Sequence, residues 1–379
     1  MITAQDIEKL RSMRTADNSV LSLYVPVPLD PAELRGLPAL ATDLIDSAVA
    51  AADHGLHGQG SAASQVSAGD HDAVRNLLEA HAREWLGHTL AVFACGELGL
   101  LEMLPLPGQI AARGVLATRP HVRPLLEVLQ RFPDYLVAIV GRQHGWLFSV
   151  TAGQVETIAR PEAAGVRSRG YSGWHGLEAH RVHQRAIQLA QTHYRHIATI
   201  LAGQATAGRP RPLVIGGHTD GIAQLLRTLP PAARETFAGS FSADPLALTP
   251  ARARALADQV IAGWAVRSEQ EAAAAALDAV PGRESAIGLR ACLAAVNAGA
   301  ADLLLVGDDG MVPGFVCARC GQFSTADDGC PDWGTATRAV PDLLEEMALQ
   351  VLDSGGQVIA IRDAPVSCAA RLRYPVAGA

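Results

Sequence analysis

The clearest candidate for metal chemistry in this sequence is a cysteine-bearing segment, "CARCGQFSTADDGCPDWG". Cys317 and Cys320 form a Cys-x-x-Cys pair, and Cys330 begins a second pair. Two such pairs hold zinc in a ribbon through four thiolates. Trp333, however, stands where the fourth cysteine is expected. Because three thiolates leave the site one ligand short, we expect no stoichiometric zinc and no other cofactor.

Nearby acidic residues keep one alternative open for this segment. Asp327, Asp328 or Asp332 could complete a tetrahedron around zinc, although a metal-free hairpin is the simpler interpretation. The chain has only 6 cysteines, too few for a disulfide framework in 379 residues. In a reducing compartment they are thiols or metal ligands.

A second candidate is a segment that mixes arginine with aromatic side chains and is expected to be a loop. Guanidinium groups pair with phosphates, and aromatic rings stack on unpaired bases, so this mixture favours contact with RNA. The alternative is that Trp174 packs onto its own domain and the arginines are solvated. The predicted RNA-binding residues in the loop and on the following helix are Arg167, Arg169, Gly170, Tyr171, Gly173, Trp174, His175, Arg181 and Arg185.

Histidines gather in the same part of the chain. Five of the 13 are His175, His180, His183, His193 and His196. Two pairs have the i, i+3 spacing of one helix face, but only Glu178 accompanies them as a further ligand type, so a polar helix face is the preferred interpretation. Histidine can serve as a general base near neutral pH, so His175 is a candidate for that role, yet no partner residue can be identified. It is the one catalytic candidate.

The tripeptide Gly355-Gly356-Gln357 has a structural explanation. The preceding residues "VPDLLEEMALQVLDS" place Leu344, Met347 and Val351 on one helical face. Glycine is the usual residue just after a helix, where φ is positive. "QVIAI" then predicts a buried strand that Gln357 opens. We therefore expect a tight helix-to-strand turn rather than an exposed catalytic loop.

Bulk composition limits the classes of protein that fit. A hydrophobic fraction of 49% with 18% charged residues is typical of an ordered globular protein, and the length fits two or three domains. No apolar run is long enough for a membrane span. The first residues predict an amphipathic helix with Thr3 and Asp6 as caps, so we expect a cytoplasmic protein. A net charge of −7 predicts that any RNA contact is local and gives no sign of DNA binding.

The elements that position these residues predict three domains, 1–132, 133–278 and 279–379. The first has a strand at "VLSLYVPVP", helices near 40–52 and 72–86, paired strands "TLAVFAC" and "LGLLEMLPLP", and a closing helix "HVRPLLEVLQRF". The second has three consecutive strands with a hairpin turn at Ala152 and Gly153, then the Arg167–His175 loop. A long helix over 177–202 with a buried stripe follows, and then a strand "PLVIGG" and helices at 222–229 and 250–276. The predicted stripe residues are Val182, Ala186, Leu189, Ala190, Tyr194, Ile197 and Leu201.

The third domain alternates helix and strand. "SAIGLRACLAAVNAGA" predicts a helix, "DLLLVG" a strand, "DLLEEMALQVL" a helix and "QVIAI" a strand, with the cysteine segment inserted between them. Such alternation predicts an α/β sandwich with a partly parallel sheet.

In this order the chain resembles the bacterial homologues of archaeo-eukaryotic peptide release factors and of the ribosome-rescue factor Pelota. "SVLSLYVPVP" and "LAVFACGELGLLEMLPLP" resemble the first domain, and "YLVAIVGRQHGWLFSVTAGQVET" resembles the middle domain. "LAAVNAGAADLLLVGDDG" with "LLEEMALQVLDSGGQVIAI" resembles the C-terminal domain. The resemblance implies an α/β protein with an N-terminal α/β domain, an RNase H-like middle domain and an L7Ae-like C-terminal domain.

The resemblance also implies where a catalytic tripeptide would lie. In the family the Gly-Gly-Gln loop follows the third strand of the middle domain, a place held here by "RSRGYSGWHGLEAH". No glutamine occurs between Gln154 and Gln184, and the literal triplet lies in the predicted third domain. The form "SGWHGLEAHRVHQRA" is similar to hibernation factors of the Balon type, which lack the tripeptide. The stop-codon motif Asn-Ile-Lys-Ser is also missing from the first domain.

We therefore expect a cytoplasmic translation factor that binds rRNA at the ribosomal A site, in hibernation or in the handling of stalled ribosomes. Its further partners on this interpretation are tRNA and an elongation factor, without membrane or DNA. The alternative is an enzyme: a peptide release factor or peptidyl-tRNA hydrolase in which His175 or backbone groups of a divergent loop replace the glutamine.

Overall fold

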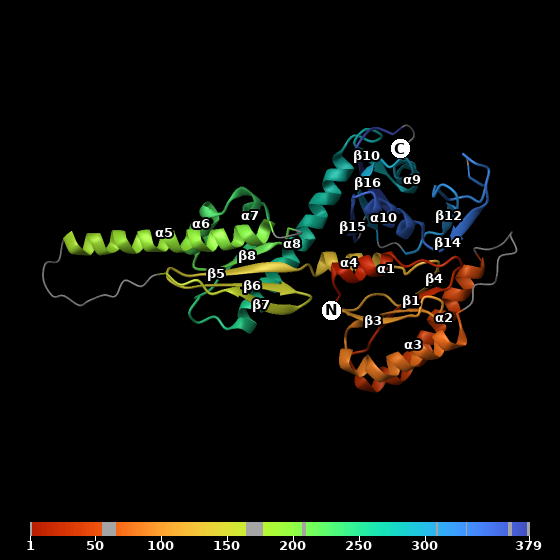
Figure 1. The fold of residues 1–379 in the computed structure, drawn as a ribbon, viewed down its shortest axis with the longest axis horizontal. Helices are drawn as coiled ribbons and strands as arrows, with labels where there is room; N and C mark the ends of the chain where they lie inside the picture. Colours follow the sequence, from red (N-terminus) through yellow and green to blue (C-terminus); the bar gives the residue numbers. More distant parts are fainter. Residues whose placement is uncertain are drawn as a thin grey trace. The chain divides into compact units, whose positions relative to one another are not determined.

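The computed structural model describes residues 2–54, 66–163, 177–206, 210–307, 310–330, 332–362 and 366–376. The chain forms two compact units (Figure 1): unit 1 combines residues 1–130 with 268–379, and unit 2 consists of residues 131–267. Both have mixed α/β folds, which confirms the predicted class. The first and third predicted domains thus share one compact unit, and the boundaries of three separate domains stay a prediction.

The first sheet of unit 1 is antiparallel, with the order β3-β2-β1-β4. The predicted pairing of "TLAVFAC" with "LGLLEMLPLP" is confirmed. The edge strand β4, in a segment with little β-branched character, was not predicted. The bounds are β1 (Val20–Pro26), β2 (Thr89–Cys95), β3 (Leu100–Leu106) and β4 (Arg113–Ala117).

Helices cover both faces of this sheet. Leu21, Leu23 and Val25 alternate with Val20 and Tyr24 along β1, so each face receives apolar side chains. One face packs against α2 (Leu37–His54) and α3 (Ala68–His81), which lie together below the sheet in Figure 1. The other packs against α1 (Ala4–Arg11) and α4 (Arg123–Arg131).

Short helical segments complete this part of unit 1, and its first helix begins as predicted. Thr3 caps α1 and forms a reciprocal capping box with Asp6, as expected. The 3-10 helices are η1 (Pro31–Gly36), which leads into α2, and η2 (Ala82–Trp85), which continues α3.

The second sheet of unit 1 has the order β10-β16-β11-β15, with β11 and β15 parallel and the other pairs antiparallel. A partly parallel sheet was predicted here. The predicted helix from Ser285 is shorter than expected, because Gly288 with φ +84° separates a short strand from it. The bounds are β10 (Ser285–Ile287), α9 (Leu289–Asn297), β11 (Ala301–Gly307), α10 (Leu343–Asp353), β15 (Gln357–Ile361) and β16 (Cys368–Leu372).

The two faces of this second sheet are also covered. Helices α9 and α10 pack on one face, where Leu304 and Val306 point. The end of α8 (Pro250–Asp278) packs on the other through Ala276, against Leu303 and Leu305. Inserted between β11 and α10 is a small antiparallel sheet of order β13-β12-β14 that carries the cysteines. Its strands are β12 (Gly314–Cys317), β13 (Phe323–Ser324) and β14 (Thr337–Val340).

Unit 2 contains a five-stranded sheet of order β7-β6-β5-β8-β9, in which β5, β8 and β9 run parallel. The predicted hairpin between β6 and β7 is confirmed: Ala152 and Gly153 have φ of 47° and 74°, as a type I′ turn requires. The edge strand β9 was not predicted. The bounds are β5 (Tyr135–Val140), β6 (Gly145–Thr151), β7 (Gln154–Ala159), β8 (Leu213–Gly217) and β9 (Phe237–Ser242).

Helices cover both faces of the unit 2 sheet as well. One face packs against α5 (Leu177–Thr206), α6 (Thr219–Thr228) and α7 (Pro231–Glu235), and the other against the first part of α8. The predicted stripe of α5 is confirmed at Tyr194, Ile197 and Leu201, which are buried. The side chains of Val182 and Ala186 lie outside the described residues.

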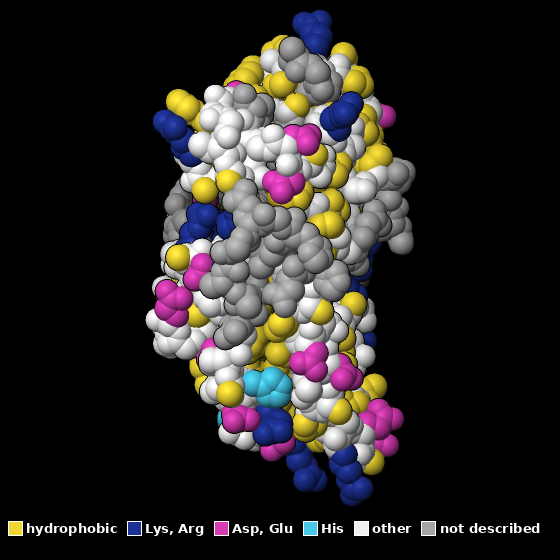
Figure 2. Space-filling view, turned by 90° about the vertical axis from the view of Figure 1, so that its right-hand side faces the viewer, with side chains coloured by type: hydrophobic (Ala, Val, Ile, Leu, Met, Phe, Trp, Pro, Cys, Tyr) yellow, Lys and Arg dark blue, Asp and Glu magenta, His cyan; other side chains and the backbone are white. Residues whose placement is uncertain are grey.

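None of the described helices combines the length and apolar character needed to cross a membrane. Figure 2 shows one face of the molecule, on which the described Lys and Arg side chains are scattered among hydrophobic and acidic ones instead of forming one basic patch. This pattern agrees with the net charge of −7.

Candidate functional site

The predicted RNA-binding loop lies outside the described residues, which resume at Leu177 after Ala163. The candidates Arg167, Arg169, Gly170, Tyr171, Gly173, Trp174 and His175 therefore stay predictions. The elements on either side are as predicted: β7 ends at Ala159 and α5 begins at Leu177. Arg181 lies on α5, and its side chain is not among the described ones. Arg185 is exposed on the same helix.

The histidines of α5 do not all lie on a polar face. His196 is exposed, whereas His193 is buried at 3% exposure, so the predicted polar face is wrong for His193. Neither ring nitrogen of His193 has a hydrogen-bond partner among the described residues. Burial lowers the pKa of His193, which favours a neutral ring. No described carboxylate or cysteine joins it in a metal-ligating group.

The Gly-Gly-Gln segment is a helix-ending turn, as predicted. Gly355 has φ +74°, and its N–H donates to the carbonyl of Leu352 at 3.0 Å. The N–H of Gly356 donates to Val351 at 2.8 Å, which completes a Schellman motif. Gln357 then begins β15 and pairs with Leu303. The predicted burial of this strand is wrong, because Gln357 is exposed and the other four residues are only half-buried at the edge of the sheet.

Space as well as φ requires glycine in this turn. A Cβ on Gly356 would lie 2.6 Å from Cγ1 of Val351 and 2.9 Å from the carbonyl oxygen of Asp302. The segment is thus held by its own helix and by a neighbouring strand, as a tight turn and not as an adaptable loop.

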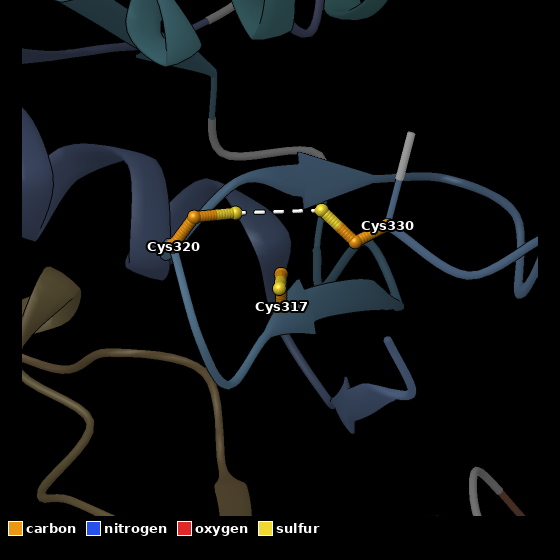
Figure 3. A group of neighbouring side chains, drawn as sticks. All are labelled: Cys317, Cys320 and Cys330. Atoms are coloured by element: carbon orange, nitrogen blue, oxygen red, sulfur yellow. Dashed lines mark hydrogen bonds between the residues drawn. The ribbon is translucent and has the colours of Figure 1, made fainter. Parts of the chain in front are cut away.

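The structure brings the three predicted metal-ligand cysteines together (Figure 3). The Sγ atoms of Cys317, Cys320 and Cys330 all lie within 4.8 Å of one another, and those of Cys320 and Cys330 are 3.4 Å apart. Cys317 and Cys330 are buried, whereas Cys320 is exposed. Among the described residues no further His, Cys, Asp or Glu joins this group.

Two similar turns hold these sulfur atoms. The N–H of Gly321 donates to the carbonyl of Cys317 at 2.9 Å, and the N–H of Gly334 donates to Cys330 at 2.7 Å. The N–H of Cys317 donates to Gln322 at 2.9 Å, and that of Cys330 donates to Thr335 at 3.0 Å. Both glycines have positive φ, 77° and 59° respectively. The second turn therefore repeats the hydrogen bonds of the first, with Cys330 in the place of Cys317.

In this correspondence Trp333 occupies the place of Cys320. Its side chain is half exposed, and the guanidinium carbon of Arg319 lies 3.9 Å from the ring centroid. The turns are thus linked by a cation–π contact as well as by the cysteines. An indole offers only an N–H donor, so Trp333 provides no metal ligand.

The surroundings of the thiols shift the pKa values of Cys317 and Cys320 in opposite directions. The hydroxyl of Thr335, 3.3 Å from Sγ of Cys317, and backbone amides including that of Arg319 lower the pKa of Cys317 to about 6. For Cys320, the amide of Gln322 lowers the pKa, but desolvation and the neighbouring thiols outweigh it and raise the pKa to about 11. Cys317 is therefore the first of these two thiols to ionise.

The acidic residues that the sequence predicts as possible fourth ligands are hydrogen-bonded to other side chains or exposed to solvent. Asp332 accepts a 2.6 Å hydrogen bond from Nε2 of Gln322, and Asp327 accepts one of 2.8 Å from Thr337. Asp328 is exposed. These contacts leave the cysteine group with three ligands among the described side chains.

A buried charged cluster in unit 1 was missed by the sequence analysis. Glu345 at the start of α10 accepts hydrogen bonds from the backbone amides of Val122 and Arg123, at 2.8 and 2.7 Å. These amides begin α4, so a carboxylate from one helix satisfies the N-terminal donors of another. Arg119 pairs with the neighbouring Glu346.

Asp342, the N-cap of α10, is the second centre of this charged cluster. Its Oδ2 lies 3.0 Å from Nε2 of His121 and 2.9 Å from Nη2 of Arg123. Burial would raise the pKa of Asp342, but the hydrogen bond with His121 and the charge of Arg123 outweigh it and lower this pKa. Burial raises the pKa of Glu345. The cluster ties the first and last parts of unit 1 together.

The sequence pattern of α10 contains only a weak indication of this charged cluster. The apolar stripe through Leu344 and Met347 predicted one buried face of α10, yet the helix is buried almost all round, including Glu345 and Glu346. A charged pair inside the run "LLEEMALQVL" was the one available hint that partners exist elsewhere.

Comparison with known families supports the resemblance found in the sequence. Residues 120–278 match the model of bacterial archaeo-eukaryotic release factor family 10. This span includes all of unit 2. The predicted release-factor-like family is thus confirmed over these residues. No curated protein matches the sequence.

Three solved structures to which this chain is similar have low sequence identity. An archaeal translation termination factor, aRF1, is 14% identical, with 98% of this chain and 97% of that chain covered and a TM-score of 0.25. Pelota of Archaeoglobus fulgidus is 14% identical over 77% and 81% of the two chains, with a TM-score of 0.33. Dom34 of S. cerevisiae is 11% identical over 76% and 80%, with a TM-score of 0.38.

Proposed function

We propose that this protein is a cytoplasmic, ribosome-binding translation factor that enters the A site in hibernation or in the handling of stalled ribosomes. The observation that carries the proposal is the match of residues 120–278 to the release-factor family. RNA at the A site, tRNA and an elongation factor are the partners that follow from this role.

The residues proposed to bind rRNA are those of the Arg167–His175 segment, with Arg181 and Arg185. They supply positive charge for phosphates and rings for stacking on unpaired bases. Arg185 is exposed on α5, close in sequence to this segment, so it is available for such contact. Binding without peptide release is favoured because the one Gly-Gly-Gln triplet forms the Schellman turn after α10.

Co-sedimentation with ribosomes tests this function. The full-length protein is mixed with vacant, stalled and stationary-phase ribosomes, and the fraction that pellets is measured over a range of salt concentrations. We expect association with at least one ribosome state that weakens as salt rises. Protein that stays in the supernatant with all three states would contradict the proposal.

Variants then assign the contact surface. The double variant Arg169→Ala with Trp174→Ala should weaken binding substantially, because stacking contributes about 1–3 kcal/mol per base. Arg185→Ala should weaken it less. Arg195→Ala is the matched control, since Arg195 is also exposed on α5 but lies farther along the helix. Equal effects at Arg185 and Arg195 would argue against a local RNA-binding surface near the start of α5.

A further inference from the structure

We propose that Cys317, Cys320 and Cys330 bind one thiophilic d10 cation through three thiolates, and that the fourth coordination position, which corresponds to Trp333, has no protein ligand. This proposal goes beyond ribosome binding and does not depend on it. It assigns a metal site to the insert between β11 and α10.

The spacing of the sulfur atoms suits one shared ion. Thiolates bound at about 2.3 Å to a tetrahedral or trigonal ion lie roughly 3.8–4.0 Å apart. The three Sγ atoms here are all within 4.8 Å of one another, with Cys320 and Cys330 at 3.4 Å. The largest of these separations exceeds the expected spacing by no more than about 1 Å, a difference that side-chain rotation can supply.

The two turns prepare the backbone for this role. Each begins at a cysteine whose carbonyl accepts a hydrogen bond from the N–H of a positive-φ glycine four residues later. The N–H of the same cysteine donates to the carbonyl of the residue after that glycine. In the first turn the N–H of Arg319 also donates to Sγ of Cys317 at 3.4 Å, which stabilises a thiolate. Because these bonds exist before an ion binds, little ordering remains for the binding step.

The fourth position distinguishes this site from a closed zinc ribbon. By the correspondence of the two turns, the residue that would supply the fourth sulfur is Trp333, whose ring instead stacks with Arg319. The nearby Asp327 and Asp332 accept hydrogen bonds from Thr337 and Gln322. A solvent molecule or an added small ligand would therefore complete any four-coordinate ion.

The chemistry of three thiolates selects soft cations over Mg²⁺ or Ca²⁺, which require oxygen ligands. Cu(I) is soft and is satisfied by three sulfur ligands, whereas structural zinc requires four ligands. We therefore expect Cu(I) and Cd²⁺ to bind well and Zn²⁺ to bind but to be lost on dialysis against a chelator.

The test uses the full-length protein, purified and kept reduced, and titrated separately with Cu(I), Cd²⁺ and Zn²⁺ in competition with a chelator. Ultraviolet charge-transfer absorption reports thiolate coordination, and elemental analysis gives the stoichiometry. We expect one ion per chain. Cys320→Ser should lower the affinity more than about 100-fold, because loss of even an outer-shell partner costs about 10- to 100-fold. Cys320 is exposed, so the fold should tolerate this change.

Two further variants complete the experiment. Cys95→Ala removes a thiol in the first sheet of unit 1 and should leave metal binding unchanged. Trp333→Cys supplies the missing thiolate and should raise the affinity for Zn²⁺ more than about 100-fold, with zinc retained through dialysis. Trp333 is half exposed, so its loss should not unfold the chain.

The outcomes separate clearly. A wild-type protein that binds none of the three ions, or whose binding is unchanged in Cys320→Ser, overturns the three-thiolate site. If Trp333→Cys binds Zn²⁺ no more tightly than wild type, the assigned fourth position is wrong and the proposal falls with it. One ion per chain in wild type, loss in Cys320→Ser and gain in Trp333→Cys support it.

Discussion

The two ends of helix α10 differ in a way that residue type alone does not suggest. At its N-terminal end, Asp342 and Glu345 are charged residue types that usually face solvent, yet both are buried and bonded to residues 121–123. At its C-terminal end, Gly355, Gly356 and Gln357 spell a catalytic tripeptide but form a turn into β15. The partners that surround a residue, more than its type, decide whether it stabilises the fold or meets a ligand.

The largest expected effect is at the N-terminal end. Glu345→Ala removes the acceptor of two buried backbone amides, those of Val122 and Arg123. Each buried donor left unpaired costs about 1–3 kcal/mol, so the free energy of unfolding should fall by about 2–6 kcal/mol. Denaturant unfolding measures the loss. Glu79→Ala, at an exposed glutamate of α3, should change stability by no more than about 0.5 kcal/mol.

If Glu345→Ala proves no more destabilising than Glu79→Ala, the carboxylate does not stabilise the start of α4, and the contrast between the two ends of α10 is lost.

The next largest effect is expected in the turn. Gly356→Ala introduces a Cβ at 2.6 Å from Val351 Cγ1 and 2.9 Å from the Asp302 carbonyl oxygen, so the turn must shift. Overpacking of this kind costs about 1–3 kcal/mol, which thermal unfolding can measure. Gly36→Ala is the control, because a Cβ there meets nothing within 4 Å and its φ is ordinary. Equal melting temperatures for the two variants would show that the turn is not tightly packed.

A pH-dependent effect should distinguish Asp342 from Glu345. The lowered pKa of Asp342 means that its contribution is present above the pKa of the unfolded chain and is lost as pH falls through the folded pKa. The raised pKa of Glu345 gives the opposite pH dependence, because the contribution of Glu345 to stability is present at low pH and is lost as pH rises through the folded pKa. The stability difference between wild type and Asp342→Asn should therefore be greatest near neutral pH and shrink below about pH 4.

Unfolding free energies of wild type and Asp342→Asn, measured side by side across this pH range, test the sign. A difference that grows as pH falls would mean that Asp342 is held in its protonated form, and the ionic picture of the cluster would be wrong.

The smallest expected effect is at the tripeptide itself. Gln357 is exposed at the first position of β15, so Gln357→Ala should alter stability by no more than about 0.5 kcal/mol. Ribosome association should also be unchanged, and neither wild type nor variant should release peptide from a stalled complex above background. Peptide release by wild type that Gln357→Ala abolishes would make the literal triplet an active site.

Much of the fold could be predicted because its signals are periodic. The strands "VLSLYVP" and "YLVAIV" were placed correctly from side-chain patterns, as were Tyr194, Ile197 and Leu201 of the α5 stripe. The strands β4, β9 and β10 were missed, since all three lie at sheet edges where a full apolar pattern is not required. The interior strand β16 was also missed, because its sequence CAARL contains alanine and arginine instead of β-branched residues. At the candidate sites, the cysteine pattern predicted the right three ligands, but their mutual distances depend on how two turns fold against each other.

By itself, the sequence determined what neighbouring residues decide: the capping box of Thr3 and Asp6, the glycine turn after α10, and the substitution of Trp333 for a fourth cysteine. Such features depend on bonds within a few residues, so local chemistry specifies them. The tertiary structure alone decided that Glu345 is buried against Val122, 223 residues away in sequence. It also decided that three sulfur atoms meet. The physical reason is that burial and coordination depend on distant segments that only the folded chain brings within bonding distance.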